Sequence, residues 1–218
     1  MSATPHAAAK GPAKPGVRTI VASVATLLLL AAMALDTKVV KIGSAADVQP
    51  NVFSPADFGA EQFPKIQQDI EKRAVDAVTL AEAIAKDKDA AAKQYGVPAS
   101  IGPEMSVKFT GVVGKGESGV YYVTVAGLPD TLHVRVQTGP AINGTDLRDA
   151  TGTISFGQFV NQIDYQNAGS ALNKEMKKQV LSKIDNSQLT GKTISVVGAF
   201  KLVNPNSWLV APVKLDVQ

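Results

Sequence analysis

Three aspartates in the second half of the chain are the residues best suited by type to do chemistry. Asp146, Asp149 and Asp164 carry carboxylates that could surround a cation or act as general acids and bases. Their spacing does not match the D-x-D-x-D-G pattern of a calcium loop, and Asp146 and Asp149 suit the capping of a turn. We therefore predict no metal-ligating or catalytic residue in this group and keep Asp146 as a candidate contact residue.

The other familiar catalytic arrangements are incomplete in this sequence. The chain contains no cysteine, which excludes disulfides, thiolate metal centres and thiol catalysis. A Ser-His-Asp arrangement would need His133, the one histidine beyond the N-terminal arm, and no serine lies in a G-x-S-x-G context. Residues 190–193 resemble the end of a phosphate-binding loop, but Asn186 stands where that loop needs glycine. The sequence predicts a non-enzymatic protein without cofactors.

The net positive charge of the chain comes from its beginning. There are 22 Lys and Arg against 19 Asp and Glu, and three of the cations lie in residues 1–18, which contain no acid. The remaining 200 residues carry 19 charges of each sign. A neutral body lacks the basic field that binding to a phosphate backbone requires, so we expect no nucleic-acid partner. Trp208 and Tyr165 are our aromatic candidates for contact with another ligand or partner, with core packing as the alternative for Trp208.

The N-terminal segment predicts export from the cytoplasm. Residues 1–18 are typical of a disordered basic arm, and residues 19–35 form an uncharged run that would span about 25 Å as a helix. The run is either a signal peptide cleaved after Ala34, in the pattern Ala32-Met33-Ala34, or an uncleaved transmembrane anchor. In both cases the preceding cations hold the arm in the cytoplasm and send the body across the inner membrane.

Residues 36–53 are expected to form a connector, with a candidate strand at Thr37–Ile42, and residues 54–98 a helical section. Ser54 and Pro55 are a typical helix start, and apolar residues then recur every three or four positions from Ile66 to Ile84. Pro64 is a second candidate start. A break near Val78–Thr79 is expected, because Thr79 and Glu82 have capping-box spacing.

Alternating apolar residues predict a β-domain over residues 103–218. The expected order is three strands, a β-rich stretch, a helix capped by Asn167, and two final strands; the ranges are Met105–Val113, Val120–Ala126, Thr131–Thr138, Thr153–Tyr165, Ala168–Ile184, Lys192–Leu202 and Trp208–Val217. A helix before the last two strands is typical of an OB-fold. The predicted class is therefore α+β: an N-terminal membrane or signal helix, a helical section, and an OB-like small antiparallel β-barrel. Another small barrel or an open antiparallel sheet is the alternative.

A set of motifs across residues 36–218 resembles a known family. The motifs are GTDLRD at 144–149, SFGQFVNQIDYQ at 155–166, GAF at 198–200, NPNSW at 204–208, PV at 212–213 and KVVKI at 38–42. Together they resemble DUF2291, a family of predicted periplasmic lipoproteins of unknown function. The resemblance implies an accessory role at the bacterial cell envelope and transfers no catalytic residue. Members are often encoded near ABC-type sugar-uptake transporters, which implies a transporter component as a partner.

This chain departs from the lipoprotein pattern, because no cysteine follows the apolar run. Lipidation is therefore impossible, and an uncleaved helix would serve as the inner-membrane anchor instead. The expected function is that of a membrane-tethered periplasmic binding or accessory protein linked to ABC-type sugar uptake. The alternative is a structural envelope protein that acts through protein–protein contacts and is unrelated to transport.

Overall fold

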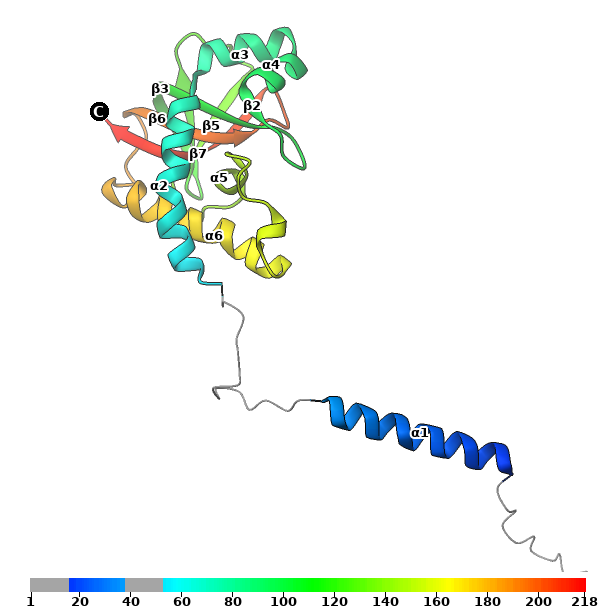
Figure 1. Ribbon diagram of the computed structural model, residues 1–218. Coiled ribbons are helices and arrows are strands. Elements are labelled where there is room, and N and C mark those ends of the chain that lie inside the picture. The colour runs from blue at the N-terminus through cyan, green and yellow to red at the C-terminus, as the bar shows by residue number, and fades with distance from the viewer. Residues whose placement is uncertain (1–15, 38–52) are drawn as a thin grey trace, which may run out of the picture. The chain divides into compact units, whose positions relative to one another are not determined.

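The computed structural model describes residues 16–37 and 53–218 (Figure 1). The chain divides into two units, residues 1–52 and residues 53–218. In the first unit, helix α1 (Val17–Asp36) contains the whole predicted apolar run, and it is long and apolar enough to cross a membrane. The arm before residue 16, most of the connector and all but the first residue of the candidate strand Thr37–Ile42 lie outside the described residues.

The helical section contains three helices. These are α2 (Pro55–Arg73), α3 (Ala77–Lys86) and α4 (Lys88–Tyr95). Helix α2 begins at Pro55 as predicted, because the Ser54 hydroxyl accepts a hydrogen bond from the Asp57 amide. Pro64 lies inside α2, so its prediction as a helix start was wrong. An earlier cap had already begun the helix.

The break between α2 and α3 comes earlier than predicted. Residues 75–76 form a short strand, β1 (Val75–Asp76), which pairs with Val107 and Lys108. The Asp76 carboxylate accepts hydrogen bonds from the amides of Val78 and Thr79 and caps α3, so the prediction of Thr79 as the cap was wrong. The pairing of residues 75–76 with residues 107–108 determines where α2 ends and α3 begins. No pattern in the neighbouring sequence indicates this boundary.

The strands of the second half are close to those predicted. They are β3 (Glu104–Glu117), β4 (Val120–Val125), β5 (His133–Gln137), β6 (Thr193–Lys201) and β7 (Ser207–Val217), with the short β2 (Gly96–Val97) beside β3. Pairing runs from β3 through β4, β5, β7 and β6, and β6 pairs with β3 again. Each of the five strands therefore has at least two partners. The expectation of an entirely antiparallel arrangement was wrong, because β5 and β7 pair in parallel.

The segment between β5 and β6 is helical where a β-rich stretch was predicted. It contains α5 (Asp146–Asp149), the 3₁₀ turn η1 (Phe156–Gln158), α6 (Gln162–Gln179) and the 3₁₀ turn η2 (Leu181–Lys183). The cap of α6 is Asn161, whose side chain accepts a hydrogen bond from the Asp164 amide, and not Asn167. The alternating apolar residues of 156–165 imitate a strand, but the Asn161 cap and the helical stripe that follows determine the structure.

One apolar core fills residues 53–218 and is shared by the helices and the strands. Leu172 and Met176 of α6 and Ile66 and Ile70 of α2 are buried in it. Trp208 is fully buried, stacks on Phe200 with ring centroids 4.6 Å apart, and donates its indole N–H to the Pro205 carbonyl. The prediction of Trp208 as an exposed contact residue was therefore wrong, and the alternative of core packing is confirmed.

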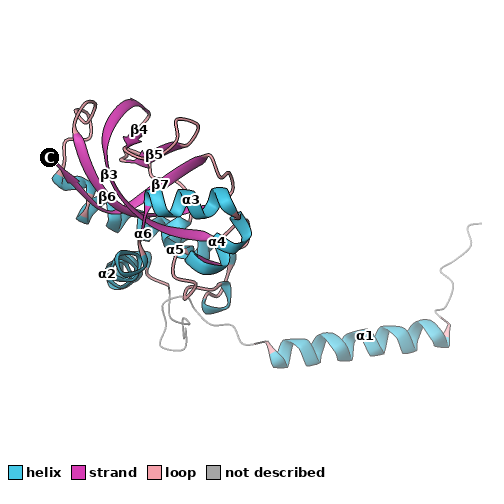
Figure 2. Ribbon diagram, turned by 90° about the horizontal axis from the view of Figure 1, so that it is seen from above, coloured by secondary structure: helices cyan, strands magenta, loops and turns pink. Residues whose placement is uncertain are grey.

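Helices α2 and α6 pack closely against each other. Figure 2 views α2 almost along its axis, with β4 and β5 on the far side of the domain. Gly59 of α2 permits the approach, because a Cβ built on it would lie 2.8 Å from the carbonyl oxygen of Ala171 in α6. Gly169, also buried in α6, is different: a Cβ there would meet nothing closer than 3.8 Å.

Candidate functional site

Strands β3 and β6 and helix α5 bring five charged side chains together, and we call Glu104, Asp146, Arg148, Asp149 and Lys201 the charged cluster. Glu104 at the start of β3 and Lys201 at the end of β6 are register partners in the antiparallel ladder. Helix α5 supplies the other three side chains. The cluster therefore combines residues that are nearly one hundred positions apart in sequence.

Glu104 is the most deeply buried member of the cluster. Its side chain is 0% exposed, and its Oε1 lies 3.1 Å from Nζ of Lys201. This is an ion-pair distance, but the contact lacks the angles of a good hydrogen bond, and Oε2 has no hydrogen-bond partner. A carboxylate in such surroundings is poorly solvated, so burial favours its protonated form.

Asp149 has the opposite environment. Its carboxylate receives two hydrogen bonds from the Arg148 guanidinium, at 2.8 and 3.2 Å, and one from the Thr145 hydroxyl at 2.7 Å. The Arg148 guanidinium also stacks on the ring of Tyr165, with its Cζ 3.7 Å from the ring centroid, and donates to the Tyr165 carbonyl. Nζ of Lys201 lies 3.7 Å from Asp149, so the lysine stands between two carboxylates.

These environments separate the pKa values of the acids. Burial, with a smaller contribution from Asp146, raises the pKa of Glu104 to about 8, against the attraction of Lys201. Burial also raises the pKa of Asp146. For Asp149, burial is outweighed by the hydrogen bonds from Arg148 and Thr145, and the pKa is lowered. The carboxylates around Lys201 overcome its own burial and raise its pKa.

The charged cluster joins α5 to the sheet. Within residues 16–37 and 53–218 there is no group of three His, Cys, Asp or Glu side chains arranged to hold a metal ion. The acidic and basic side chains of the charged cluster face one another. The cluster is therefore a network of mutually compensating charges inside the fold. A carboxyl that holds its proton near neutral pH is its one chemically unusual member.

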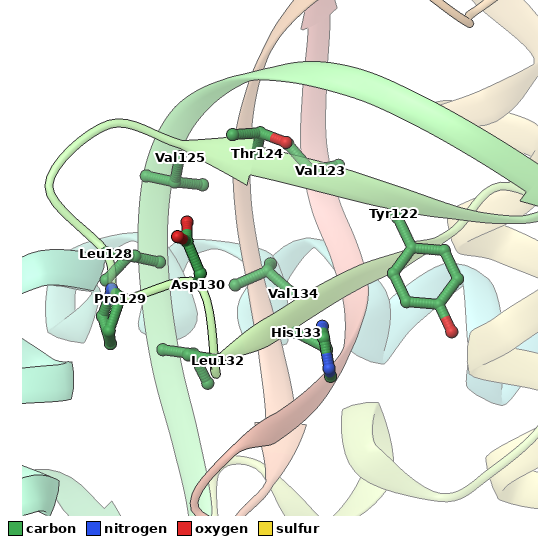
Figure 3. Close-up of a pocket in the computed structure, with 10 residues that line it drawn as sticks. All are labelled: Tyr122, Val123, Thr124, Val125, Leu128, Pro129, Asp130, Leu132, His133 and Val134. Atoms are coloured by element: carbon green, nitrogen blue, oxygen red, sulfur yellow. The ribbon is translucent and has the colours of Figure 1, made fainter.

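A second candidate site is a shallow hollow on β4 and β5 with a volume of about 140 Å³ (Figure 3). Figure 3 shows Val125, Leu128, Leu132 and Asp130 toward one end and the rings of Tyr122 and His133 toward the other. The two rings meet edge to face, with centroids 6.1 Å apart. Tyr122 is 49% exposed, and His133 and Asp130 are exposed as well. The hollow thus offers an aromatic surface with a carboxylate and an imidazole beside it.

The structure brings together two of the three candidate contact residues, Asp146 and Tyr165. Both are half-buried: Asp146 is a member of the charged cluster, and Tyr165 stacks on Arg148 of the same cluster, whereas Trp208 is in the core. Asp164 lies away from the cluster and receives a hydrogen bond from Asn161. Our sequence reasoning missed Glu104, Arg148 and Lys201. The available signal was Glu104 itself, a carboxylate directly before the apolar alternation of β3.

Comparison with known proteins identifies the family. The model of DUF2291, described as a predicted periplasmic lipoprotein, matches residues 23–216. The chain belongs to the DUF2291 family. Membership together with α1 assigns this DUF2291 protein to the cell envelope, either membrane-anchored or periplasmic. No curated protein matches the chain.

Among solved structures, the DUF2291 chain is similar to the crystal structure of an OB-fold protein from Thermotoga maritima. The sequence identity is 18%, the TM-score is 0.62, and the match covers 77% of this chain and all of the other. At this identity the likeness concerns the fold alone. It agrees with the α+β class and the OB-like strand order predicted from the sequence.

Proposed function

We propose that this protein is a non-enzymatic binding protein, tethered to the inner membrane by α1, whose OB-like domain holds a ligand against the β4–β5 surface. The observation that carries the proposal is the exposed pair Tyr122 and His133 beside the hollow of about 140 Å³. The second and third strands of an OB-fold, here β4 and β5, are the face on which such domains bind oligonucleotides and oligosaccharides. The neutral charge of the body disfavours the first of these ligand classes.

The chemistry of attachment supports the retention of α1 as a tether. Family members are predicted lipoproteins, but a thioether-linked lipid needs a cysteine and this sequence has none. The whole of α1, 20 residues, reaches about 30 Å, and its uncharged run of residues 19–35 reaches about 25 Å, close to the thickness of the hydrocarbon core of a bilayer. An uncleaved helix would therefore replace the lipid as the tether.

The tether can be tested on the native protein. We expect the mass of the membrane-fraction protein to include the N-terminal segment up to residue 34. We expect Ala34→Leu, which removes the A-x-A pattern, to change the mass only by the substitution itself and to leave the location unchanged. Intact-protein mass spectrometry after fractionation measures both. A wild-type chain that begins at Leu35 while the Ala34→Leu chain remains intact would show a cleaved signal peptide and contradict the tether.

The hollow is too small to enclose a typical ligand, for which pockets of about 300–1,000 Å³ are usual. It suits one ring or one side chain of a ligand that lies across the strands. A sugar ring fits its chemistry, because the C–H face can pack on Tyr122 while the hydroxyls reach Asp130 and His133. Sugars are therefore the first probes to use.

The binding surface can be tested by calorimetric titration of the full chain with glucose, galactose and ribose. For a sugar that binds, we expect Tyr122→Ala or His133→Ala to weaken affinity by about tenfold or more, as for a well-packed contact residue. Phe156→Ala is the matched control, because Phe156 and Tyr122 are 50% and 49% exposed. Equal losses in all three variants, or no binding of any of these sugars, would count against a sugar site on β4–β5.

A link to ABC-type sugar uptake is a narrower hypothesis, which rests on the family resemblance alone. Deletion of the gene would then impair growth on at least one sugar. Unchanged growth on every sugar would favour the alternative of a structural envelope protein acting through protein–protein contacts. For that alternative the outer faces of the helices are better candidates than strand edges, since each of β3–β7 already pairs on two sides.

A further inference from the structure

Three large apolar side chains project into solvent near the start of α6. Phe156, Val160 and Ile163 are 50%, 77% and 68% exposed, and we call them the apolar patch. They lie within eight consecutive residues: Phe156 on η1, Val160 in the short loop that follows, and Ile163 in the first turn of α6. Exposed apolar side chains that are concentrated in one short segment are candidates for contact with a protein partner or a membrane.

The apolar patch rests on a packed aromatic base. Phe159 contacts Phe53 and Phe58 with ring centroids 5.3 and 5.7 Å apart, and Tyr165 contacts both Phe156 and Phe159 at 5.7 and 5.4 Å. Edge-to-face contacts of this kind fix the orientation of the segment. The patch is therefore presented by a rigid support.

The same aromatic base contains the point where the chain enters this unit. Phe53 is its first residue, and only residues 37–52 separate it from Asp36, the last residue of α1. A fully extended chain of this length spans at most about 60 Å. If α1 is anchored in the bilayer, the patch is continuously held within reach of the lipid surface, at a high effective concentration.

We propose that the apolar patch docks on the periplasmic leaflet of the inner membrane, with Phe156, Val160 and Ile163 inserted at the boundary between headgroups and acyl chains. This inference rests on the proposed anchoring by α1. Three side chains are too few for a stable protein–protein interface, which usually buries about 800 Å² on each partner. They suffice for a tethered contact, because the tether has already removed most of the cost of association.

The charges near the patch indicate the kind of lipid contact. Residues 153–166 contain no Lys or Arg and one acid, Asp164. Attraction to anionic headgroups would require basic side chains, so the contact depends on insertion of apolar groups. Docking is therefore independent of the anionic lipid content and of salt.

The absence of cysteine makes the test direct. The full chain is reconstituted at one copy per nanodisc. An environment-sensitive fluorophore is attached to a single introduced cysteine, either Val160→Cys or Ile163→Cys. Spin-labelled lipids in the nanodisc serve as the quencher. Ile101→Cys is the matched control, because Ile101 and Val160 are both 77% exposed and Ile101 lies in the loop between β2 and β3. We expect lipid quenching at positions 160 and 163 about threefold or more above position 101, in neutral and anionic nanodiscs alike.

A second variant separates docking from mere proximity. Phe156→Asp combined with Val160→Asp should reduce the quenching at Ile163→Cys to the level of position 101. Because Phe156 packs on Tyr165, its loss costs some stability, and thermal unfolding of the double variant shows that the domain is still folded. Equal quenching at all positions, or quenching that the aspartates do not reduce, would overturn the proposal. Reconstitution fixes α1 in the bilayer, so this result is independent of whether cells cleave the segment, which the mass of the native N-terminus reports.

Discussion

Between pH 5 and pH 8 the free energy of unfolding should fall by about 1.4 kcal/mol per pH unit, which is the slope for one proton. The cause is Glu104, whose pKa is raised from an ordinary 4.5 to about 8 in the folded protein. Its folded form binds the proton more tightly than the unfolded chain, so its stabilisation is complete below the unfolded pKa and is lost as the pH rises through about 8. The raised pKa of Asp146 acts in the same direction.

Urea unfolding of the full chain in nanodiscs, followed through the fluorescence of Trp208, measures this slope. Trp208 is the one tryptophan of the chain and is fully buried, so its emission reports on the core. Glu104→Gln should flatten the slope and be more stable than the wild type at pH 8, because Gln resembles the protonated carboxyl. Glu175→Gln is the control: the pKa of Glu175 is lowered, so it stays ionised across this range and its variant should keep the wild-type slope.

Asp149 should act at the acid end of the range and with the opposite sign. Its pKa is lowered in the folded protein, so its stabilisation is present above its ordinary pKa of 3.8 and is lost as the pH falls below that value. A stability curve with a maximum near pH 4, between the two ordinary pKa values of 3.8 and 4.5, follows from the two groups together. A curve that keeps rising from pH 5 to pH 8 would show that Glu104 ionises normally.

Gly59→Ala should destabilise the protein by about 1–3 kcal/mol, the usual cost of forcing an extra methyl group into a packed interface. The sign is informative, because helix propensity alone would make Gly to Ala inside a helix stabilising by about 1 kcal/mol. The added Cβ would lie 2.8 Å from the Ala171 carbonyl, a backbone atom that moves only if α6 itself moves. The midpoint and slope of urea unfolding measure the change.

Gly169→Ala is the matched control for this substitution. Gly169 is also buried inside a helix that contacts another element, but its Cβ would meet the nearest atom, Cγ2 of Thr145, at an ordinary 3.8 Å. We expect Gly169→Ala to stabilise the protein by about 0.5–1 kcal/mol. If both substitutions stabilise, then α2 and α6 are not in the close contact described.

Sequence reasoning succeeded where a short-range pattern carries the physics. Strand β6 was predicted at Lys192–Leu202 and observed at Thr193–Lys201, because alternate burial along a strand is written directly into its residues. The start of α2 was correct for a similar reason, since Ser54 and Pro55 act on amides within the next turn. The family could also be predicted, because motifs at several separate positions agreed.

Prediction from the sequence failed where two local patterns competed or where the contacting residue is remote in sequence. Residues 156–165 alternate like a strand, and the cap at Asn161 outweighed that pattern. Trp208 beside an Asn-Pro-Asn turn resembled a surface residue, and its burial depends on Phe200 across the β6–β7 pair. The alternation of β3 did not show that Glu104 at its first position would be enclosed.

The sequence by itself determined the class of the protein and its destination: an apolar helix after three cations, a neutral body, and an alternating second half with a helix before its last two strands. These properties are additive over neighbouring residues, so composition and periodicity are enough to report them. The tertiary structure decided that Glu104 meets Lys201, that Tyr122 and His133 share one surface, and that Phe53 belongs to the aromatic base on which Phe156 packs. Each of these contacts depends on strand register or helix packing between segments that are distant in sequence. Such packing determines which side chains are buried, and burial changes their chemistry, so the residues next to them in sequence do not report it.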